Sequence, residues 1–329
     1  MLTLVLVFLF QSNTFLYNDS TDDHLIRQTM QSTYELKITE ARVAAKALMD
    51  HRPDHPAGYT LMAETYWWEA QMDPGNTLIE KAYETAQEAA VEKGESALKL
   101  AKYAKIEVTA YLGSAWGSYA RFQVTQKGAY FKALRAGLRA HGYADMVYKM
   151  DPNYWDIYVG IGAFNYFTGS LPAVIKPFAW LFGARGNRDL GIEQLKTAMA
   201  RARYSQTEAR IVYYTAMLSD ENWPEGFKTL EKLRTDYPNN HVIYTWFTDW
   251  YRKQKKNLAG ADYFEKVYNE EIKRSPVLAK YALLEKVELL DAEKRKTEAI
   301  QTLDRMKLIP SSDPVLAKKV QVWERTLRK

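Results

Sequence analysis

The chain has 329 residues, no cysteine, and 45 basic against 40 acidic residues, which gives a formal net charge of +5. The absence of cysteine excludes thiol catalysis, disulfides and cysteine-ligated metal sites. The mild, interspersed charge is typical of solvated helix faces, and it argues against nucleic-acid binding, which requires a basic stripe on a recognised module.

The first residues form an apolar run from Leu2 to Phe10 that only Thr3 interrupts. The run is too short to span a bilayer as a helix, but it fits the hydrophobic region of a signal peptide. No Lys or Arg precedes it, and no Ala-x-Ala cleavage site follows. We interpret residues 1–18 as a signal peptide or membrane-anchor segment and residues 19–329 as a helical domain. We therefore expect an exported, periplasmic or envelope-associated protein, with a cytoplasmic location as the alternative.

One spacing then recurs along the chain, in which a small residue precedes two apolar residues on the same helical face and a proline. The copies are Ala41-Ala45-Leu48-Pro53, Ala140-Ala144-Val147-Pro152 and Gly226-Leu230-Leu233-Pro238. A small side chain lets two helices cross closely, and proline suits a first helical turn. The pattern resembles the tetratricopeptide (TPR) repeat, an antiparallel helix pair of about 34 residues that stacks on its neighbours.

A helix pair of this kind cannot bury its apolar face alone, so the pairs must stack into a continuous array. Strand-like alternation is absent from the sequence over any useful length. Near the end, Pro276-Val277-Leu278-Ala279-Lys280 reappears as Pro314-Val315-Leu316-Ala317-Lys318. The sequence therefore predicts an all-α, TPR-like α-α superhelical solenoid of roughly seven to eight helix pairs.

Aromatic residues mark a first candidate binding surface. Tyr66 occupies a repeat-core position, whereas its neighbours Trp67 and Trp68 are candidates to line a concave groove formed by the first helices of the pairs. Such a groove is where a helical-repeat protein docks a peptide or protein segment.

The regular register is interrupted by an insert near residues 165–190. It begins with Asn165 and Tyr166 and continues through the apolar stretch 171–182, in which Lys176 is the only charged residue. Its apolar side chains must be covered by another surface. It either folds back over the solenoid groove as a short helix, or it presents Phe178 and Trp180 to a partner or a membrane.

The loop that follows, from Gly183 to Asp189, offers Arg185 and Arg188 to a phosphate or carboxylate. It lacks the Gly-Lys-Ser/Thr of a P-loop, so a structural loop with an Asp189 cap is the favoured interpretation. His51 and His55 flank Pro53, which argues against the single helix that a zinc pair would need. We assign no catalytic residue, metal site or cofactor.

A narrower resemblance rests on Gly160-x-Gly162-x-Phe164-Asn165, Leu171-Pro172 and Gly183-x2-Gly186-x-Arg188-x2-Gly191. This series is similar to the inclusion-body-clearance family of tetratricopeptide proteins. The resemblance implies a non-enzymatic helical-repeat protein linked to membranes or lipid bodies, and it favours an adaptor role.

The sequence thus predicts a non-catalytic scaffold for a protein or peptide partner. Its candidate contact residues are Trp67, Trp68, Asn165, Tyr166, Phe178, Trp180, Arg185 and Arg188. A rival interpretation is a lipid- or glycan-binding protein that uses the 171–182 insert, and a third is an enzyme built around Arg185 and Arg188. The sequence leaves the oligomeric state open.

Overall fold

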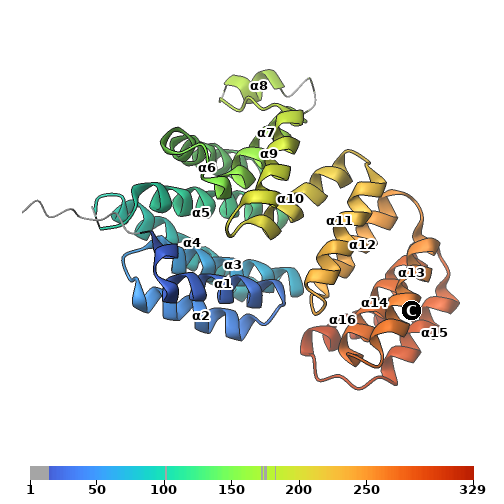
Figure 1. The fold of residues 1–329 in the computed structure, drawn as a ribbon. Helices are drawn as coiled ribbons and strands as arrows, with labels where there is room; N and C mark the ends of the chain where they lie inside the picture. Colours follow the sequence, from blue (N-terminus) through green and yellow to red (C-terminus); the bar gives the residue numbers. More distant parts are fainter. Residues whose placement is uncertain (1–14, 101, 172, 174–175, 182) are drawn as a thin grey trace, which may run out of the picture. The chain divides into compact units, whose positions relative to one another are not determined.

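A computed structural model describes residues 15–100, 102–171, 173, 176–181 and 183–329, without the side chains of residues 177–179. All regular elements in these ranges are helices (Figure 1). Of the helices described, none is both long and apolar enough to cross a membrane. Residues 1–14 of the predicted signal or anchor segment (1–18) lie outside the described residues. Its last residues are described, and they form the short helix η1 (Leu16–Asn18).

The chain divides into two compact units. Unit 1 comprises Met1–Thr33, Lys37–Ala70 and Pro74–Ala209, and unit 2 comprises Tyr34–Leu36, Gln71–Asp73 and Arg210–Lys329.

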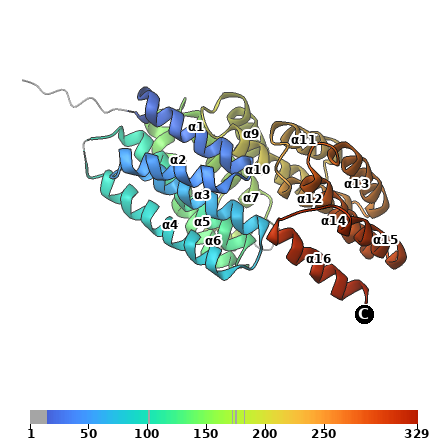
Figure 2. The ribbon, with the colours of Figure 1, turned by 90° about the horizontal axis from the view of Figure 1, so that it is seen from below.

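The helices of unit 1 follow one another as antiparallel neighbours. They are η1, α1 (Ser20–Tyr34), α2 (Ile38–His51), α3 (Pro56–Met72), α4 (Thr77–Ala97), α5 (Lys105–Thr125), α6 (Tyr130–Met150), η2 (Trp155–Ile157), α7 (Tyr158–Gly169), α8 (Lys176–Leu181) and α9 (Arg188–Arg201). Figure 2 shows α2 to α5 side by side. Helix α5 packs against α6, and α7 packs against α9, so the short α8 lies outside the pairing.

Unit 2 continues the same arrangement. Its helices are α10 (Gln206–Ser219), whose residues 206–209 belong to unit 1, then α11 (Trp223–Asp236), α12 (Val242–Lys253), α13 (Asn257–Glu271), α14 (Pro276–Ala292), α15 (Lys296–Lys307) and α16 (Pro314–Leu327). The repeated Pro-Val-Leu-Ala-Lys segments start α14 and α16, where proline stands at the first helical position. Ser275 and Asp313 cap these helices by accepting hydrogen bonds from main-chain N–H groups.

Most of the small and apolar repeated residues occupy the core, as the sequence predicts, whereas Ala140 is half-buried. Ala41, Ala45 and Leu48 of α2 are fully buried, and Leu230 and Leu233 of α11 are equally inaccessible. These side chains lie on one face of each helix, which is the face turned toward the neighbouring pair. Over the described residues the structure confirms the all-α class, and within each unit consecutive helices pack on one another as a helical-repeat protein requires.

Candidate functional site

Glycines hold α7 and α9 of unit 1 in unusually close contact. A Cβ atom on Gly191 would lie 2.5 Å from the backbone nitrogen of Tyr166 and 2.7 Å from the carbonyl oxygen of Gly162. On Gly186 it would lie 2.0 Å from Oγ1 of Thr168. No side chain fits at either position, so much of the glycine series in the sequence serves the packing of this helix pair.

Asn165 fastens the loop before α9 to α7. Its Nδ2 donates to Oε1 of Gln194 at 2.8 Å, and its Oδ1 accepts from the backbone N–H of Asn187 at 3.4 Å. The side chain of Asn187 then accepts from the N–H of Leu190 and caps α9. The predicted cap at Asp189 is therefore wrong, because Asn187 holds the cap position and the helix begins at Arg188.

The other insert residues named from the sequence differ in accessibility. Tyr166 is fully buried. Arg185 and Arg188 are exposed, and Arg188 forms an ion pair of 3.1 Å with Asp189. The anion site predicted at this loop stays a prediction.

The short helix α8 stands beyond the end of α7 in Figure 1. Its Trp180 is 50% exposed and its Leu181 is 79% exposed. The described end of the insert therefore presents apolar surface to solvent. The side chain of Phe178, which the sequence analysis also named, lies outside the described residues.

Helix α6 carries a second exposed apolar surface. It has 21 residues and α7 only 12, so at about 1.5 Å per residue α6 is longer by more than two turns. The helices are antiparallel, since Ala144 and Val147 pack with Ile157 and Ile161 whereas His141 stacks on Phe164 further along α7. The first turns of α6 therefore extend past the end of α7.

The part of α6 that α7 does not cover displays Phe131, Leu134 and Leu138, which we call the α6 stripe. Phe131 is 63% exposed, and the other two are half-buried. Together with Arg135 they line a hollow of about 270 Å³. Residues three and seven positions apart share a helix face, so this spacing was the signal in the sequence that could have revealed the surface.

Trp67 and Trp68 do not line an open groove. Trp68 is 1% exposed and packs edge-to-face on Trp67, with ring centroids 5.2 Å apart. The guanidinium of Arg121 covers Trp67 at 3.8 Å from its ring. Both indoles thus belong to the interior of unit 1, and a cation from α5 lies over Trp67.

Arg121 ties together side chains of unit 1 that come from three helices. Its Nη2 donates to Oε2 of Glu64 on α3 at 2.6 Å, and its Nη1 donates to Glu208 on α10. Burial raises the pKa of Glu208, an effect that the opposed charge of Arg121 reduces. The charge of Arg121 is therefore matched by carboxylates from two neighbouring helices.

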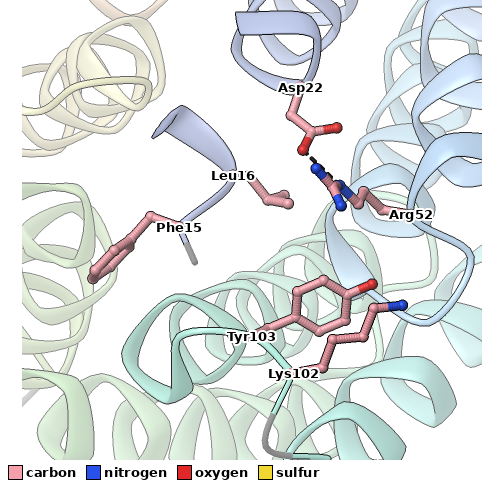
Figure 3. Close-up of a pocket in the computed structure, with 6 residues that line it drawn as sticks. All are labelled: Phe15, Leu16, Asp22, Arg52, Lys102 and Tyr103. Carbon is pink, nitrogen blue, oxygen red and sulfur yellow. Dashed lines mark hydrogen bonds and ion pairs between the residues drawn. The ribbon is translucent and has the colours of Figure 1, made fainter. Parts of the chain in front are cut away.

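A small cavity of about 150 Å³ lies near the start of the described chain (Figure 3). Its lining residues are Phe15, Leu16, Asp22, Arg52, Lys102 and Tyr103. The two cations already have carboxylate partners, because Arg52 binds Asp22 and Lys102 lies 3.3 Å from Asp54. The cavity therefore offers a ligand no uncompensated charge.

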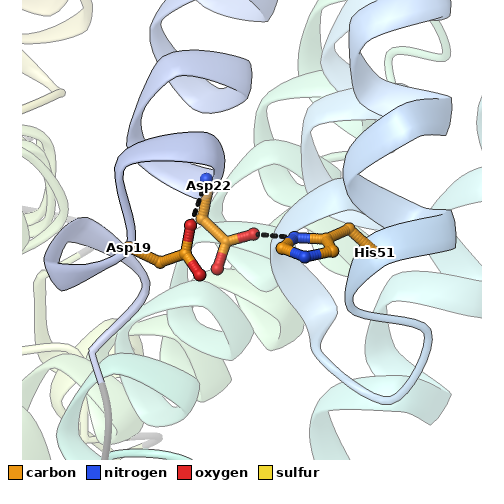
Figure 4. Close-up of side chains that lie close together, drawn as sticks. All are labelled: Asp19, Asp22 and His51. Carbon is orange, nitrogen blue, oxygen red and sulfur yellow. Dashed lines mark hydrogen bonds and ion pairs between the residues drawn. The ribbon is translucent and has the colours of Figure 1, made fainter.

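Asp19, Asp22 and His51 form the group with metal-ligand spacing found among the described residues (Figure 4). His51 Nδ1 lies 2.8 Å from Asp22 Oδ1. Arg52 donates to both carboxylates, at 2.7 Å to Asp22 and 2.8 Å to Asp19. A metal ion would compete with this guanidinium, so the cluster acts as an ion-pair lock between α1 and α2.

A buried carboxyl lies beside that lock. Glu107 is fully buried, and its Oε2 accepts the backbone N–H of Leu16 at 2.8 Å. Burial raises the pKa of Glu107 to about 7 and lowers that of the adjacent, fully buried His55 to about 3. His55 Nε2 lies 3.9 Å from Glu107 Oε2.

Unit 2 has its own buried carboxyl. Glu285 of α14 is 4% exposed, and its Oε2 accepts a hydrogen bond of 2.6 Å from Thr248 of α12. Burial raises its pKa to about 8, and the nearby charge of Glu288 adds to that effect. Groups this deeply enclosed stabilise or strain the fold, and they do not face a substrate.

Comparisons with known proteins are sparse. The chain matches no family model, and it matches no curated protein. Among solved structures, it is similar to the crystal structure of a tetratricopeptide repeat protein from Parabacteroides merdae. That likeness has 13% sequence identity and a TM-score of 0.37, over 92% of this chain and 98% of the other.

Proposed function

We propose that the protein is a non-catalytic helical-repeat scaffold that binds a protein partner through unit 1. The observation that carries the proposal is the α6 stripe, which is left uncovered because α7 is shorter than α6. A cluster of large apolar side chains on the solvent-exposed surface of a protein is typical of an interaction site. Trp180 and Leu181 of α8 add exposed apolar area in the same unit.

The titratable groups support a binding role over a catalytic one. Glu107, His55 and Glu285 have the strongly shifted pKa values that an active site would use, but all three are enclosed by the fold. Catalysis requires such groups to reach a substrate.

Site-specific photocrosslinking in the native cells tests the proposal. A photoreactive residue at Phe131 should trap a discrete partner, and one at Leu78 should not. Leu78 is the matched control, because it is an apolar residue of α4 that is 78% exposed. Equal crosslinking from both positions, or lipid and no protein at Phe131, would refute the proposal, and the lipid result would favour the rival lipid-binding function.

We further propose that the protein is exported to the cell envelope. The support is the apolar run from Leu2 to Phe10 in the sequence. Fractionation of the native cells, with N-terminal sequencing of the protein, tests this. Recovery in the cytoplasm with an intact N-terminus would contradict it.

A further inference from the structure

The chemistry of the partner can be read from the charges around the α6 stripe, on the assumption that the proposed scaffold function holds. Residues 130–144 and 157–188 contain no Asp or Glu, although the whole chain has 40 acidic residues. Their basic residues are Lys132, Arg135, Arg139, Lys176, Arg185 and Arg188. These stretches of unit 1 are therefore basic, and of the acids at their borders Asp189 pairs with Arg188 and leaves the cations of α6 unopposed within residues 130–144.

Three of these cations form a line along α6. Lys132, Arg135 and Arg139 have the same spacing as Phe131, Leu134 and Leu138, and all three are exposed. We call them the basic ridge. Since residues at this spacing share a helix face, the ridge runs parallel to the α6 stripe along one flank. Arg139 is held there by its contact with Trp116, 4.4 Å from the ring centroid.

The shape of the stripe distinguishes between kinds of partner. Its hollow of about 270 Å³ lies just below the range of about 300–1,000 Å³ that small-molecule sites occupy. A hollow of this kind accepts a protruding side chain. A fluid bilayer has no such protrusion, and membrane-binding helices instead insert their own apolar face.

We propose that the α6 stripe and the basic ridge bind an acidic amphipathic helix of a partner protein. The apolar face of that helix lies along Phe131, Leu134 and Leu138, with one large side chain in the hollow. A row of Asp or Glu beside that face meets Lys132, Arg135 and Arg139. Recognition by apolar anchors at helical spacing, with a complementary charged flank, is a recurring mode of peptide binding.

Two synthetic helical peptides test the proposal by fluorescence anisotropy with the full chain. Both carry Leu at positions i, i+3, i+4 and i+7, and one carries Glu on the flank where the other carries Lys. The Glu peptide should bind at least about tenfold more tightly, and 0.5 M salt should weaken its binding. Equal affinity for the two peptides, or no binding of either, would overturn the proposal.

Substitutions on α6 test whether the Glu peptide binds there. Phe131→Asp should lower the affinity for the Glu peptide at least about fivefold, while Leu78→Asp should leave that affinity unchanged. The triple variant Lys132→Glu, Arg135→Glu, Arg139→Glu should reverse the preference toward the Lys peptide. These residues are exposed, and circular dichroism verifies that the variants fold.

Vesicles and crosslinking separate the other outcomes. If phosphatidylglycerol vesicles bind the chain through the ridge and the Glu peptide does not, the surface serves a membrane and the proposed partner is wrong. If crosslinking from Phe131 succeeds but the Glu peptide fails, the scaffold function stands and this partner class is rejected.

Discussion

Unit 1 and unit 2 are both built from packed helices, but their enclosed charged groups are stabilised in different ways. In unit 1, Arg121 lies between Glu64 and Glu208, so that one cation holds two acids from other helices. In unit 2, Glu285 has a neutral partner, Thr248, and the charges of Glu288 and Asp249 raise its pKa further. We infer that Arg121 stabilises unit 1 as a shared cation, whereas Glu285 stabilises unit 2 only while its carboxyl is protonated.

The largest expected effect is the pH dependence of unit 2. The pKa of Glu285 is raised from 4.5 in the unfolded chain to about 8, so its proton stabilises the folded state and this contribution is lost as the pH rises between these values. Glu285→Gln should therefore increase the free energy of unfolding by up to about 5 kcal/mol at pH 9, and by little below pH 4.5.

Urea unfolding at a series of pH values, with hydrogen exchange of α12 and α14 as the local probe, measures this effect. Asp262→Asn changes an exposed acid of α13 and serves as the control. A wild-type protein whose unit 2 keeps the same stability from pH 5 to pH 9 would show that Glu285 is not protonated in the fold.

The next effect concerns the cation of unit 1. Arg121→Met leaves Glu64 and Glu208 without their shared partner. The three side chains are 20–23% exposed, so the loss should lie between the roughly 1 kcal/mol of an exposed ion pair and the roughly 3–5 kcal/mol of a buried one. Hydrogen exchange of α3 and α5 should report the loss. Adding Glu64→Gln and Glu208→Gln should recover most of it, and failure of this rescue would mean that Arg121 acts through its contact with Trp67 instead.

Glu107 provides a smaller version of the pH effect in unit 1. Its pKa is raised from 4.5 to about 7, so the stability it contributes is complete below pH 4.5 and lost as the pH rises to about 7. Glu107→Gln should add up to about 3 kcal/mol at pH 8, because the amide oxygen can still accept the N–H of Leu16. Hydrogen exchange of α5 across pH 4 to 8 measures it. A destabilised variant would indicate that the carboxylate form is required.

The smallest effect tests an exposed ion pair of unit 2. Arg305 donates to both oxygens of Glu265 and, with Lys286, lowers the pKa of Glu265 to about 2. The stability of this pair is present above pH 4.5 and is lost as the pH falls toward 2. Arg305 is 40% exposed, so Arg305→Met should cost at most about 1 kcal/mol by urea unfolding at pH 7. A loss as large as that of Arg121→Met would show that exposure does not decide the difference between the units.

The fold could be predicted from the sequence because small and apolar residues recur at fixed spacing, as Ala41 and Leu48 do. The starts of α14 and α16 also carry a local signal, because in both helices proline follows a capping side chain. The fate of Trp67 could not be predicted, because the cation that covers it is brought there by α5 and held by acids from two other helices.

The α6 stripe was open to prediction only in part. Its residues have an evident helical spacing, but their exposure follows from the shortness of α7, which no local signal in α6 records. Conversely, Asn165 was named as a contact residue because it belongs to a distinctive motif. Its side chain bonds to Gln194 and Asn187 of its own unit, so the motif reflects helix packing at least as much as binding.

The close seats of Gly186 and Gly191 against α7 have a consequence for the evolution and engineering of this chain. Neither position has room for a Cβ atom beside α7, so the chain that follows the insert packs this closely only with glycine there. A change within the insert that leaves both glycines in place therefore preserves these two close contacts with α7. Replacement of either glycine by a larger residue would instead push α9 and the loop before it away from α7.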